Sequence, residues 1–192
     1  MTPQPPSILR LDPRALKILA HPLRSRLLTA LRTNGPATAT ALAGMLETNT
    51  GATSYHLRKL ASVGLVEETE EGRGRERWWR AATEMHSWTE RDVAGDPDAQ
   101  AATDWLRRHY LQSFVERYQR WLDVQSSWPL DWQDAAGSAD FALRLSPARL
   151  LAFSADVEAI FERYRATPPE TPEDEEIVQV YVYAFPLERS PG

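Results

Sequence analysis

The stretch from Gly51 to Val66 has the residue types of a short helix that could bind the edges of nucleic-acid bases. It begins with small and polar residues, Leu57 and Leu60 can anchor one face to a core, and Gly64 provides a C-terminal stop. Hydroxyl and guanidinium groups hydrogen-bond to base edges, and a threonine methyl can contact a thymine methyl. A helix that is held by its leucines and presents these groups outward can enter the major groove of DNA.

The residues that we expect to contact DNA come from this helix and from an arginine-rich hairpin that follows it. They are Thr50, Gly51, Thr53, Ser54, Tyr55, His56, Arg58, Lys59, Arg73, Arg75 and Arg77. Small residues at the start of the helix permit close approach, and the N-terminal amides of a helix favour a phosphate. The hairpin arginines would neutralise phosphates or enter a minor groove. For His56 two interpretations stay open, a contact with DNA and local packing on the helix surface.

The helices that must position these residues are predicted from their start signals. Asp12 and Pro13 favour a first helix start, and a second helix restarts at Pro22. Thr40 is the expected cap of a third helix over residues 41–46, after which a turn leads into the DNA-binding helix. This order of elements is typical of a helix-turn-helix.

A change in the spacing of apolar residues after Gly64 predicts a β-hairpin. Residues 65–69 and 77–81 have the composition of two strands, and residues 71–76 join them. Glycines at a hairpin tip permit positive φ, and the arginines between them would project outward. The hairpin is therefore the expected wing of a winged helix-turn-helix.

Two motifs give the chain a resemblance to a known family. Residues 15–28 are similar to the opening of ArsR/SmtB-like regulators, in which a His-Pro-x-Arg sequence leads the second helix. The sequence at the DNA-binding helix resembles that family's recognition helix; it reads Ser54-Tyr55-His56-Leu57-Arg58-Lys59-Leu60 and continues to Gly64-Leu65-Val66. The match covers about 70 of the 192 residues. It implies a winged helix-turn-helix transcription regulator that dimerises through a later helix.

The charge is distributed unevenly along the chain. The net charge is −5, but residues 1–82 carry 12 Lys and Arg against 7 Asp and Glu, whereas residues 83–192 carry 10 against 20. A basic half and an acidic half suggest a nucleic-acid face and a separate domain that avoids phosphates.

Several classes of protein are disfavoured by what the sequence lacks. It contains no cysteine, so a disulfide framework and a thiolate metal site are excluded, which fits a cytoplasmic protein. No apolar run approaches the roughly 20 residues that span a bilayer. The first residues lack the features of a signal peptide, and we expect residues 1–7 to form a disordered tail.

We expect no metal, no cofactor and no enzymatic activity. The nearest candidate ligands, Asp104 and His109, stand at i and i+5, whereas pairs of zinc ligands on a helix prefer i and i+4. Neither a glycine-rich phosphate loop nor a nucleophile motif is present.

The second half begins with a long predicted helix over residues 99–125. Its apolar residues spread over an arc too broad for one neighbour, so one side could face its own chain and the other a partner subunit. The aromatic residues that could form a dimer interface, or line a pocket for an apolar effector, are Trp105, Tyr110, Phe114, Tyr118 and Trp121.

Beyond this helix we expect a small αβ module. Residues 141–145 and 177–185 have strand patterns and are expected to pair with each other. Ser146 and Pro147 begin a helix between them, with a buried face formed by Leu150, Phe153, Val157, Ile160 and Tyr164. The predicted organisation is a tail at 1–7, a winged helix-turn-helix domain at 8–95, and a dimerisation helix with an αβ domain at 96–192.

The fold class that we predict is α+β, mainly α. The predicted function is that of a homodimeric transcription repressor that reads an inverted-repeat operator in double-stranded DNA. The alternative is a winged-helix binding module whose C-terminal half binds a protein partner or an apolar small-molecule effector. A pocket for such an effector is also compatible with the DNA-binding function.

Overall fold

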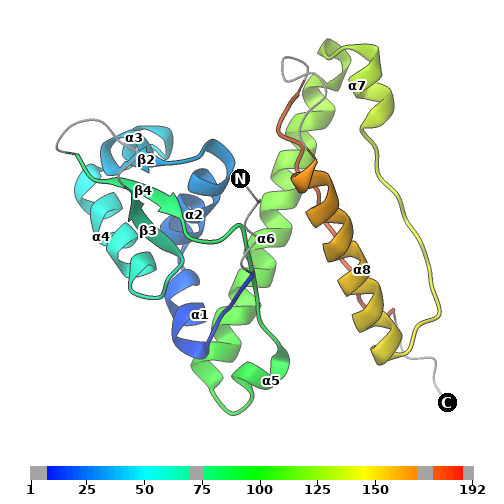
Figure 1. Ribbon diagram of the computed structural model, residues 1–192, viewed down its shortest axis with the longest axis horizontal. Coiled ribbons are helices and arrows are strands. Elements are labelled where there is room, and N and C mark those ends of the chain that lie inside the picture. Colours follow the sequence, from blue (N-terminus) through cyan, green and yellow to red (C-terminus); the bar gives the residue numbers. More distant parts are fainter. Residues whose placement is uncertain (1–7, 70–75, 168–174, 188–192) are drawn as a thin grey trace.

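In the computed structural model, which describes residues 8–69, 76–167 and 175–187, a helical domain with a small sheet lies beside one long helix (Figure 1). The helices of the first part are α1 (Pro13–Leu19), α2 (Pro22–Asn34), α3 (Ala39–Met45), α4 (Thr50–Ala61) and α5 (Glu90–Val93). The strands are β1 (Ile8–Arg10), β2 (Ala37–Thr38), β3 (Val66–Thr69), β4 (Trp78–Ala81) and β5 (Met85–Ser87). The second part contains α6 (Pro97–Val124), the 3-10 turn Gln125–Ser127, α7 (Leu130–Ala135) and α8 (Pro147–Ala166). The predicted α+β, mainly α class is confirmed.

Side-chain caps explain where the first helices begin. The Asp12 carboxylate accepts a hydrogen bond from the Ala15 amide at 2.7 Å, as its position before Pro13 predicts. For α3 the cap is Thr38, whose hydroxyl accepts from the Ala41 amide at 3.1 Å. The predicted cap at Thr40 is therefore wrong by two residues, because a hydroxyl two positions earlier is already placed to accept the free amide.

Two small sheets complete the first part. One has the order β2-β4-β3 and is antiparallel throughout, with Val66 opposite Ala81 and Thr69 opposite Trp78. This confirms the predicted hairpin. The other sheet, a parallel pair of β1 and β5, was not predicted, because each strand has only three residues and shows no alternation.

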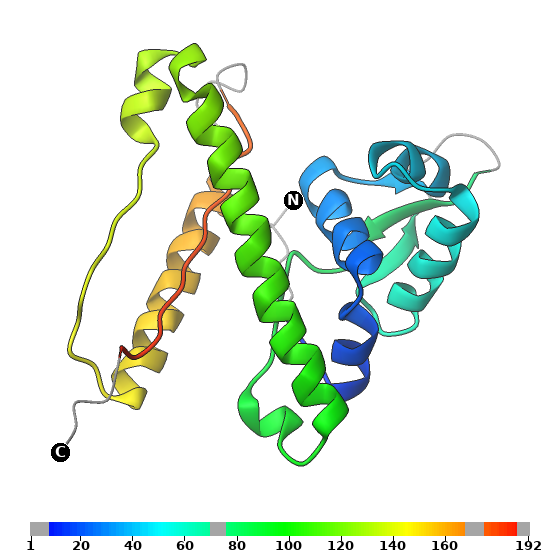
Figure 2. The ribbon, with the colours of Figure 1, turned by 180° about the vertical axis from the view of Figure 1, so that it is seen from behind.

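One hydrophobic core joins the helix-turn-helix to the first turns of α6. Its centre is made of leucines with no more than 2% of their surface exposed: Leu11, Leu16, Leu19, Leu27, Leu28, Leu31, Leu42, Leu57, Leu60, Leu65 and Leu106. Ala99 and Ala102 extend the same core along α6, which runs beside α1 (Figure 2). The core therefore crosses residue 96, the predicted domain boundary.

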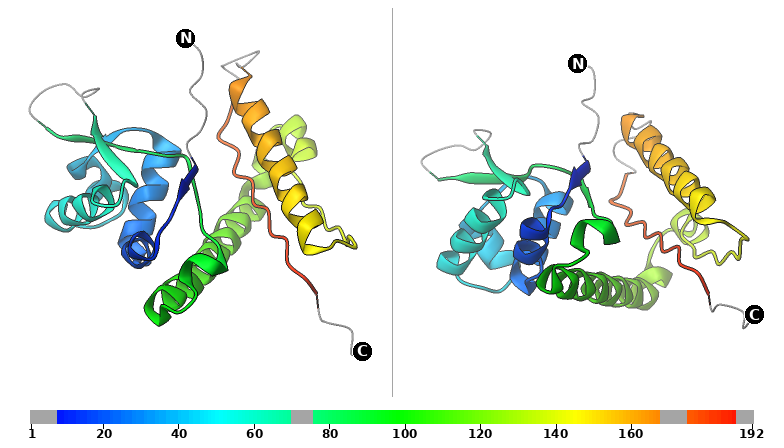
Figure 3. Two further views of the ribbon diagram at one scale, coloured as in Figure 1. Left: turned by 60° about the horizontal axis from the view of Figure 1, so that its bottom comes forward. Right: turned by 90° about the horizontal axis from the view of Figure 1, so that it is seen from below.

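The C-terminal part differs from the predicted αβ module. Residues 141–145 and 177–185 are extended but form no strand, and Phe141 and Ile177 are 82% and 72% exposed. Alternation favours an extended backbone, whereas a strand also needs a neighbouring chain to hydrogen-bond with. The 175–187 segment instead lies between α6 and α8 in both views of Figure 3.

The helix α8 also departs from its prediction. Its start is confirmed, since the Ser146 hydroxyl accepts from the Arg149 amide at 3.3 Å. Its expected buried face is wrong, because no residue of α8 is buried and Ile160 and Tyr164 are exposed. Among the described residues, none after Leu106 is buried.

A half-buried polar chain links α2 to α6. The Arg32 guanidinium donates to Nδ1 of His86 at 2.9 Å and to the Thr83 carbonyl at 3.0 Å, and Nε2 of His86 lies 2.9 Å from the Tyr110 hydroxyl. An arginine can only donate, so Nδ1 of His86 accepts and Nε2 carries the proton. Desolvation, with the Arg32 charge beside the ring, lowers the pKa of His86 to about 3.

This neutral histidine predicts that the protein loses stability in acid. Since the folded-state pKa lies below the ordinary 6.5, the unfolded chain takes up the proton first as the pH falls. Below pH 6.5 the free energy of unfolding should therefore fall by up to about 1.4 kcal/mol per pH unit on account of His86. Urea denaturation between pH 7.5 and 4.5 measures this slope, and His86→Asn should make it shallower.

A matched control is His109→Gln, which removes a more accessible imidazole stacked on Trp105 at 4.7 Å between ring centroids. It should change the slope less. Equal slopes for wild type and His86→Asn would contradict the assignment.

Candidate nucleic-acid interface

The rotation of α4 about its axis is set by three residues that are fully buried. Thr53, Leu57 and Leu60 each have 0% of their surface exposed and face the core. The opposite arc, at helical spacing, presents Gly51, Ser54, Tyr55, Arg58 and Lys59. Of these, Ser54 is half-buried and the others are exposed. The helix thus offers a polar and basic surface to solvent while its other face packs.

The structure contradicts the expectation that Thr53 faces DNA. Its side chain is buried, and its hydroxyl donates to the Asn49 carbonyl at 3.1 Å. The N-cap of α4 is Asn49, whose side-chain oxygen accepts from the Ala52 amide at 2.8 Å. Thr53 therefore belongs to the start of the helix and to the core, and its residue type gave no sign of this.

For His56 the structure favours packing over a contact with DNA. Its ring lies 4.5 Å from the ring of His21, measured between centroids, on the side of α4 that faces α2. Its Nδ1 is buried and has no hydrogen-bond partner in the described part of the chain. Burial is the main reason why the pKa of both imidazoles lies below the usual value, and Arg24 adds to the effect.

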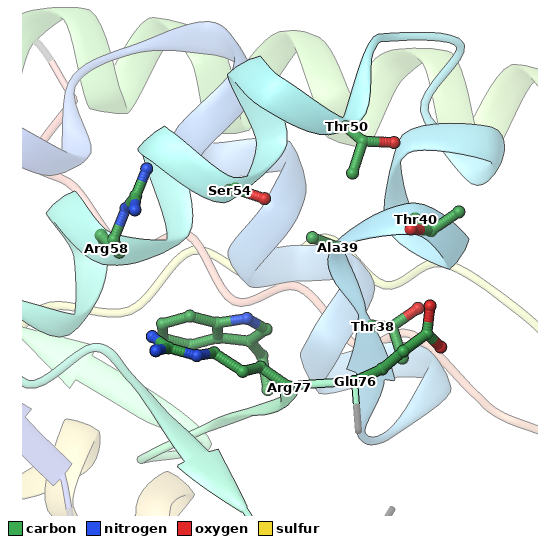
Figure 4. Close-up of a pocket in the computed structure, with 9 residues that line it drawn as sticks. Thr38, Ala39, Thr40, Thr50, Ser54, Arg58, Glu76 and Arg77 are labelled. Carbon is green, nitrogen blue, oxygen red and sulfur yellow. The ribbon is translucent and has the colours of Figure 1, made fainter. Parts of the chain in front are cut away.

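The exposed side of α4 forms one wall of an open groove of about 300 Å³. We call it the helix–wing groove; its lining residues are Thr38, Ala39, Thr40, Thr50, Ser54, Arg58, Glu76, Arg77 and Trp79. Figure 4 shows Thr50, Ser54 and Arg58 along α4, with Arg77 and Glu76 facing them across the groove. The groove brings two cations and several hydroxyl groups together from β2, α3, α4 and the segment just before β4.

In the described part of the wing, both arginines form ion pairs with glutamates of β3. Arg77 pairs with Glu68 of β3 at 3.0 Å, and Arg80 pairs with Glu67 at 2.8 Å. Both pairs are exposed and cross the β3–β4 hairpin, so each stabilises the protein by little. Arg73 and Arg75, the other predicted wing contacts, lie outside the described residues.

Five residues of the groove were not among the predicted contacts: Thr38, Ala39, Thr40, Glu76 and Trp79. The first three lie where β2 passes into α3. Thr38 enters the groove because β2 pairs with β4, which sets it opposite Trp78. A strand of two residues leaves no periodic signal in a sequence. Glu76 carries a charge that opposes a phosphate.

At the C-terminal end of α4, Lys59 lies over the ring of Tyr55, with 5.6 Å from Nζ to the ring centroid. Both side chains are exposed, and Tyr55 has 51% of its surface accessible. The contact holds the phenol against the helix and keeps a positive charge beside it.

The five aromatic residues of α6 do not form one site. Trp105 stacks on His109, and Tyr110 joins the His86 chain. Phe114 stacks on Tyr118 and contacts Tyr181 and Tyr183 of the C-terminal part, and Trp121 contacts Trp128. At a rise of about 1.5 Å per residue, Trp105 and Trp121 are about 24 Å apart along the helix. The five residues therefore cannot line a single small-molecule pocket.

Residues 8–69, 76–167 and 175–187 contain neither a clustered metal site nor a membrane-spanning helix. No group of three or more His, Cys, Asp or Glu side chains in these ranges is placed to hold a metal ion. No helix there combines the length and the apolar character needed to cross a membrane.

Comparisons with known proteins agree with the geometry of α2 to β3. Residues 19–69 match a family model described as a helix-turn-helix domain. No curated protein matches the chain. Among solved structures, the chain is similar to the homodimeric winged helix-turn-helix DNA-binding domain of a possible ArsR-family transcriptional regulator from Mycobacterium bovis. The identity is 27%, over 54% of this chain and 76% of that one, with a TM-score of 0.34.

Two more solved structures are similar to this chain, at different levels of sequence identity and coverage. A possible transcriptional regulator for arsenical resistance is 28% identical over 59% of this chain and 95% of its own, with a TM-score of 0.32. The adhesin competence repressor of Streptococcus pyogenes is 16% identical over 75% of this chain and 81% of its own, with a TM-score of 0.33.

The family match and the order of α2, β2, α3, α4, β3 and β4 define a winged helix-turn-helix domain. The chain therefore contains a helix-turn-helix domain over residues 19–69, to which β3 and β4 add a wing. The helix-turn-helix predicted from the motifs is confirmed by the family model over residues 19–69.

The burial of Thr53 predicts a change in stability. Thr53→Ala removes a methyl group from the core and a hydrogen bond to Asn49, so we expect it to lower the free energy of unfolding by about 1–2 kcal/mol. Urea denaturation at pH 7.5 measures the loss. The matched control is Ser54→Ala on the opposite arc, which should change stability by less than about 0.5 kcal/mol. A Thr53→Ala variant as stable as Ser54→Ala would show that Thr53 is not part of the core.

Proposed function

We propose that the protein is a homodimeric transcription repressor that binds an inverted-repeat operator in double-stranded DNA. The observation that carries the proposal is the exposed arc of α4 facing the helix–wing groove, with hydroxyl groups and cations on both sides. Repression follows from occupation of a promoter.

The proposed contacts divide between bases and phosphates. Arg58 is exposed at the middle of the arc and can donate two hydrogen bonds to a guanine, and Ser54 and Tyr55 can bond to neighbouring bases. Arg77, Thr40 and Thr50 lie at the sides of the groove, where the sugar–phosphate backbone would pass. Because Arg77 pairs with Glu68 in the free protein, a phosphate would have to compete with that carboxylate.

The dimer is proposed from a row of uncovered apolar residues on α6. Leu111, Val115, Tyr118 and Leu122 follow one another at spacings of four, three and four, which places them on one face of the helix. Leu111, Val115 and Leu122 are 51%, 41% and 46% exposed. We call this row the α6 seam. A second α6 packed on it would bury the row and set two α4 helices about one DNA turn apart, roughly 34 Å.

The first experiment is the sequencing of DNA that the purified protein retains from sheared DNA of its source genome. A few promoter fragments that share an inverted repeat are expected. On that repeat, Arg58→Ala and Tyr55→Ala should each cost about 1–3 kcal/mol of binding free energy, with a smaller loss on random DNA. Arg77→Ala should weaken both and reduce the salt slope by about 0.9.

Arg149→Ala serves as the matched control, since Arg149 is exposed on α8, away from the helix–wing groove. It should bind like the wild type. Retention of DNA with no shared sequence, or equal losses for the α4 variants on repeat and random DNA, would contradict sequence-specific recognition by α4.

The α6 seam predicts that a charge on it separates the subunits. Val115→Glu should weaken self-association by at least about a hundredfold, because two carboxylates would be buried against each other without a partner. Light scattering after size exclusion, at several concentrations, measures the change. The control Arg120→Glu places a carboxylate at an exposed position on the opposite side of α6 and should leave the dimer intact. A wild-type chain that is monomeric at tens of micromolar would refute the proposed dimer.

A further inference from the structure

The segment 175–187 is extended, yet its backbone is not paired. Within the described residues its amide and carbonyl groups form no backbone hydrogen bond. The one hydrogen bond recorded for this segment runs from the Gln179 side chain to the Val180 carbonyl at 3.4 Å. Backbone groups beside an apolar surface are normally satisfied by a neighbouring strand. Among the described residues, no backbone group therefore pairs with either edge of the segment.

Its two faces differ in what they contact. On one face Tyr181 and Tyr183 pack on Phe114 of α6, with centroid distances of 4.9 and 5.8 Å. On the other face Val178, Val180 and Val182 are 63%, 53% and 50% exposed. A run with valine on one side and aromatic residues on the other is typical of a strand that is covered on both faces.

The segment lacks the features that protect free strand edges. Residues 177–185 contain no charged residue and no proline, whereas Glu176 precedes them and Pro186 follows. Charged residues and proline are the usual devices against edge-to-edge pairing. An uncharged β-prone edge of nine residues is a template for another strand.

The position of residues 175–187 indicates which strand would lie nearest to them in a dimer formed through the α6 seam. Phe114, on which Tyr181 and Tyr183 rest, stacks on Tyr118 of the α6 seam with 5.8 Å between ring centroids. A twofold axis through the seam would bring the same segment of a second copy beside this one. In Figure 1, by contrast, α8 separates α6 from the chain's other extended segment, residues 136–146.

We propose that residues 176–187 pair, antiparallel, with the same residues of a second copy of the chain, and so form a two-stranded sheet across the dimer. The proposal rests on the proposed homodimer. Identical segments related by a twofold axis perpendicular to them run antiparallel. In that arrangement Glu176 lies opposite the apolar end near Phe185 and Pro186 and not opposite its own copy. The pairing satisfies the free backbone groups without placing like charges together.

The absence of cysteine from the chain makes the test direct. Single-cysteine variants at successive positions, Val178→Cys to Ala184→Cys, are oxidised mildly, and disulfide-linked dimers are measured by non-reducing electrophoresis. Linkage should peak at the one or two positions nearest the twofold axis, at about ten times the level of the control, because a disulfide needs Cβ atoms about 4 Å apart. The control is Leu151→Cys, which is 74% exposed on α8.

The same samples are examined by light scattering and by circular dichroism, so that loss of the dimer or of the fold is not mistaken for loss of the pairing. A dimer with a linkage peak supports the proposal. A dimer with no linkage above the Leu151→Cys control overturns the strand pairing and leaves the α6 dimer standing. A monomer overturns both. An internal disulfide in the double variant Leu143→Cys/Val180→Cys, in place of linked dimers, would show that the strand pairs within its own chain.

Discussion

The packing of one face of α4 is the constraint on which the candidate DNA surface depends. Thr53, Leu57 and Leu60 are excluded from solvent, and this determines which side chains on the same helix can reach a ligand. Arg58 and Tyr55 are exposed because the three core residues are not. A rotation of α4 by one residue, about 100°, would bring His56 and Leu60 into this arc and remove Ser54 and Arg58 from it. The packing of the core therefore determines which side chains of α4 are exposed. Because protein cores are close-packed, the positions of these side chains are well defined.

The same core links the DNA-facing elements to the long helix. Leu106, Ala99 and Ala102 carry it into α6, and the Arg32–His86–Tyr110 chain joins α2 to α6 through groups with defined donor and acceptor roles. Polar contacts of this kind specify one relative position, because any other leaves a donor or acceptor unsatisfied. If α6 forms the dimer, the contacts between the helix-turn-helix and α6 set the spacing of the two α4 helices.

The C-terminal part of the chain differs from the first part in how little apolar surface it buries. It is rich in apolar residues, but among the described residues after Leu106 none is buried, and Arg165 of α8 meets the first part of the chain through an ion pair with Glu84. Ordering a chain costs conformational entropy that apolar burial normally offsets. The α6 seam and the valine face of residues 178–182 are the surfaces on which a second copy would supply that burial.

The sequence by itself determined the helix starts at Asp12 and Pro22, the β3–β4 hairpin and the extent of α6, because capping residues, glycines and period are local signals. It also indicated most of the exposed arc of α4. Only the tertiary structure decided that Thr53 is buried, that His56 packs on His21, and that Thr38 enters the groove. It also decided that residues 141–145 and 177–185 have no strand partner among the described residues. These outcomes depend on contacts between residues far apart in the chain, and the type and spacing of neighbouring residues do not encode them.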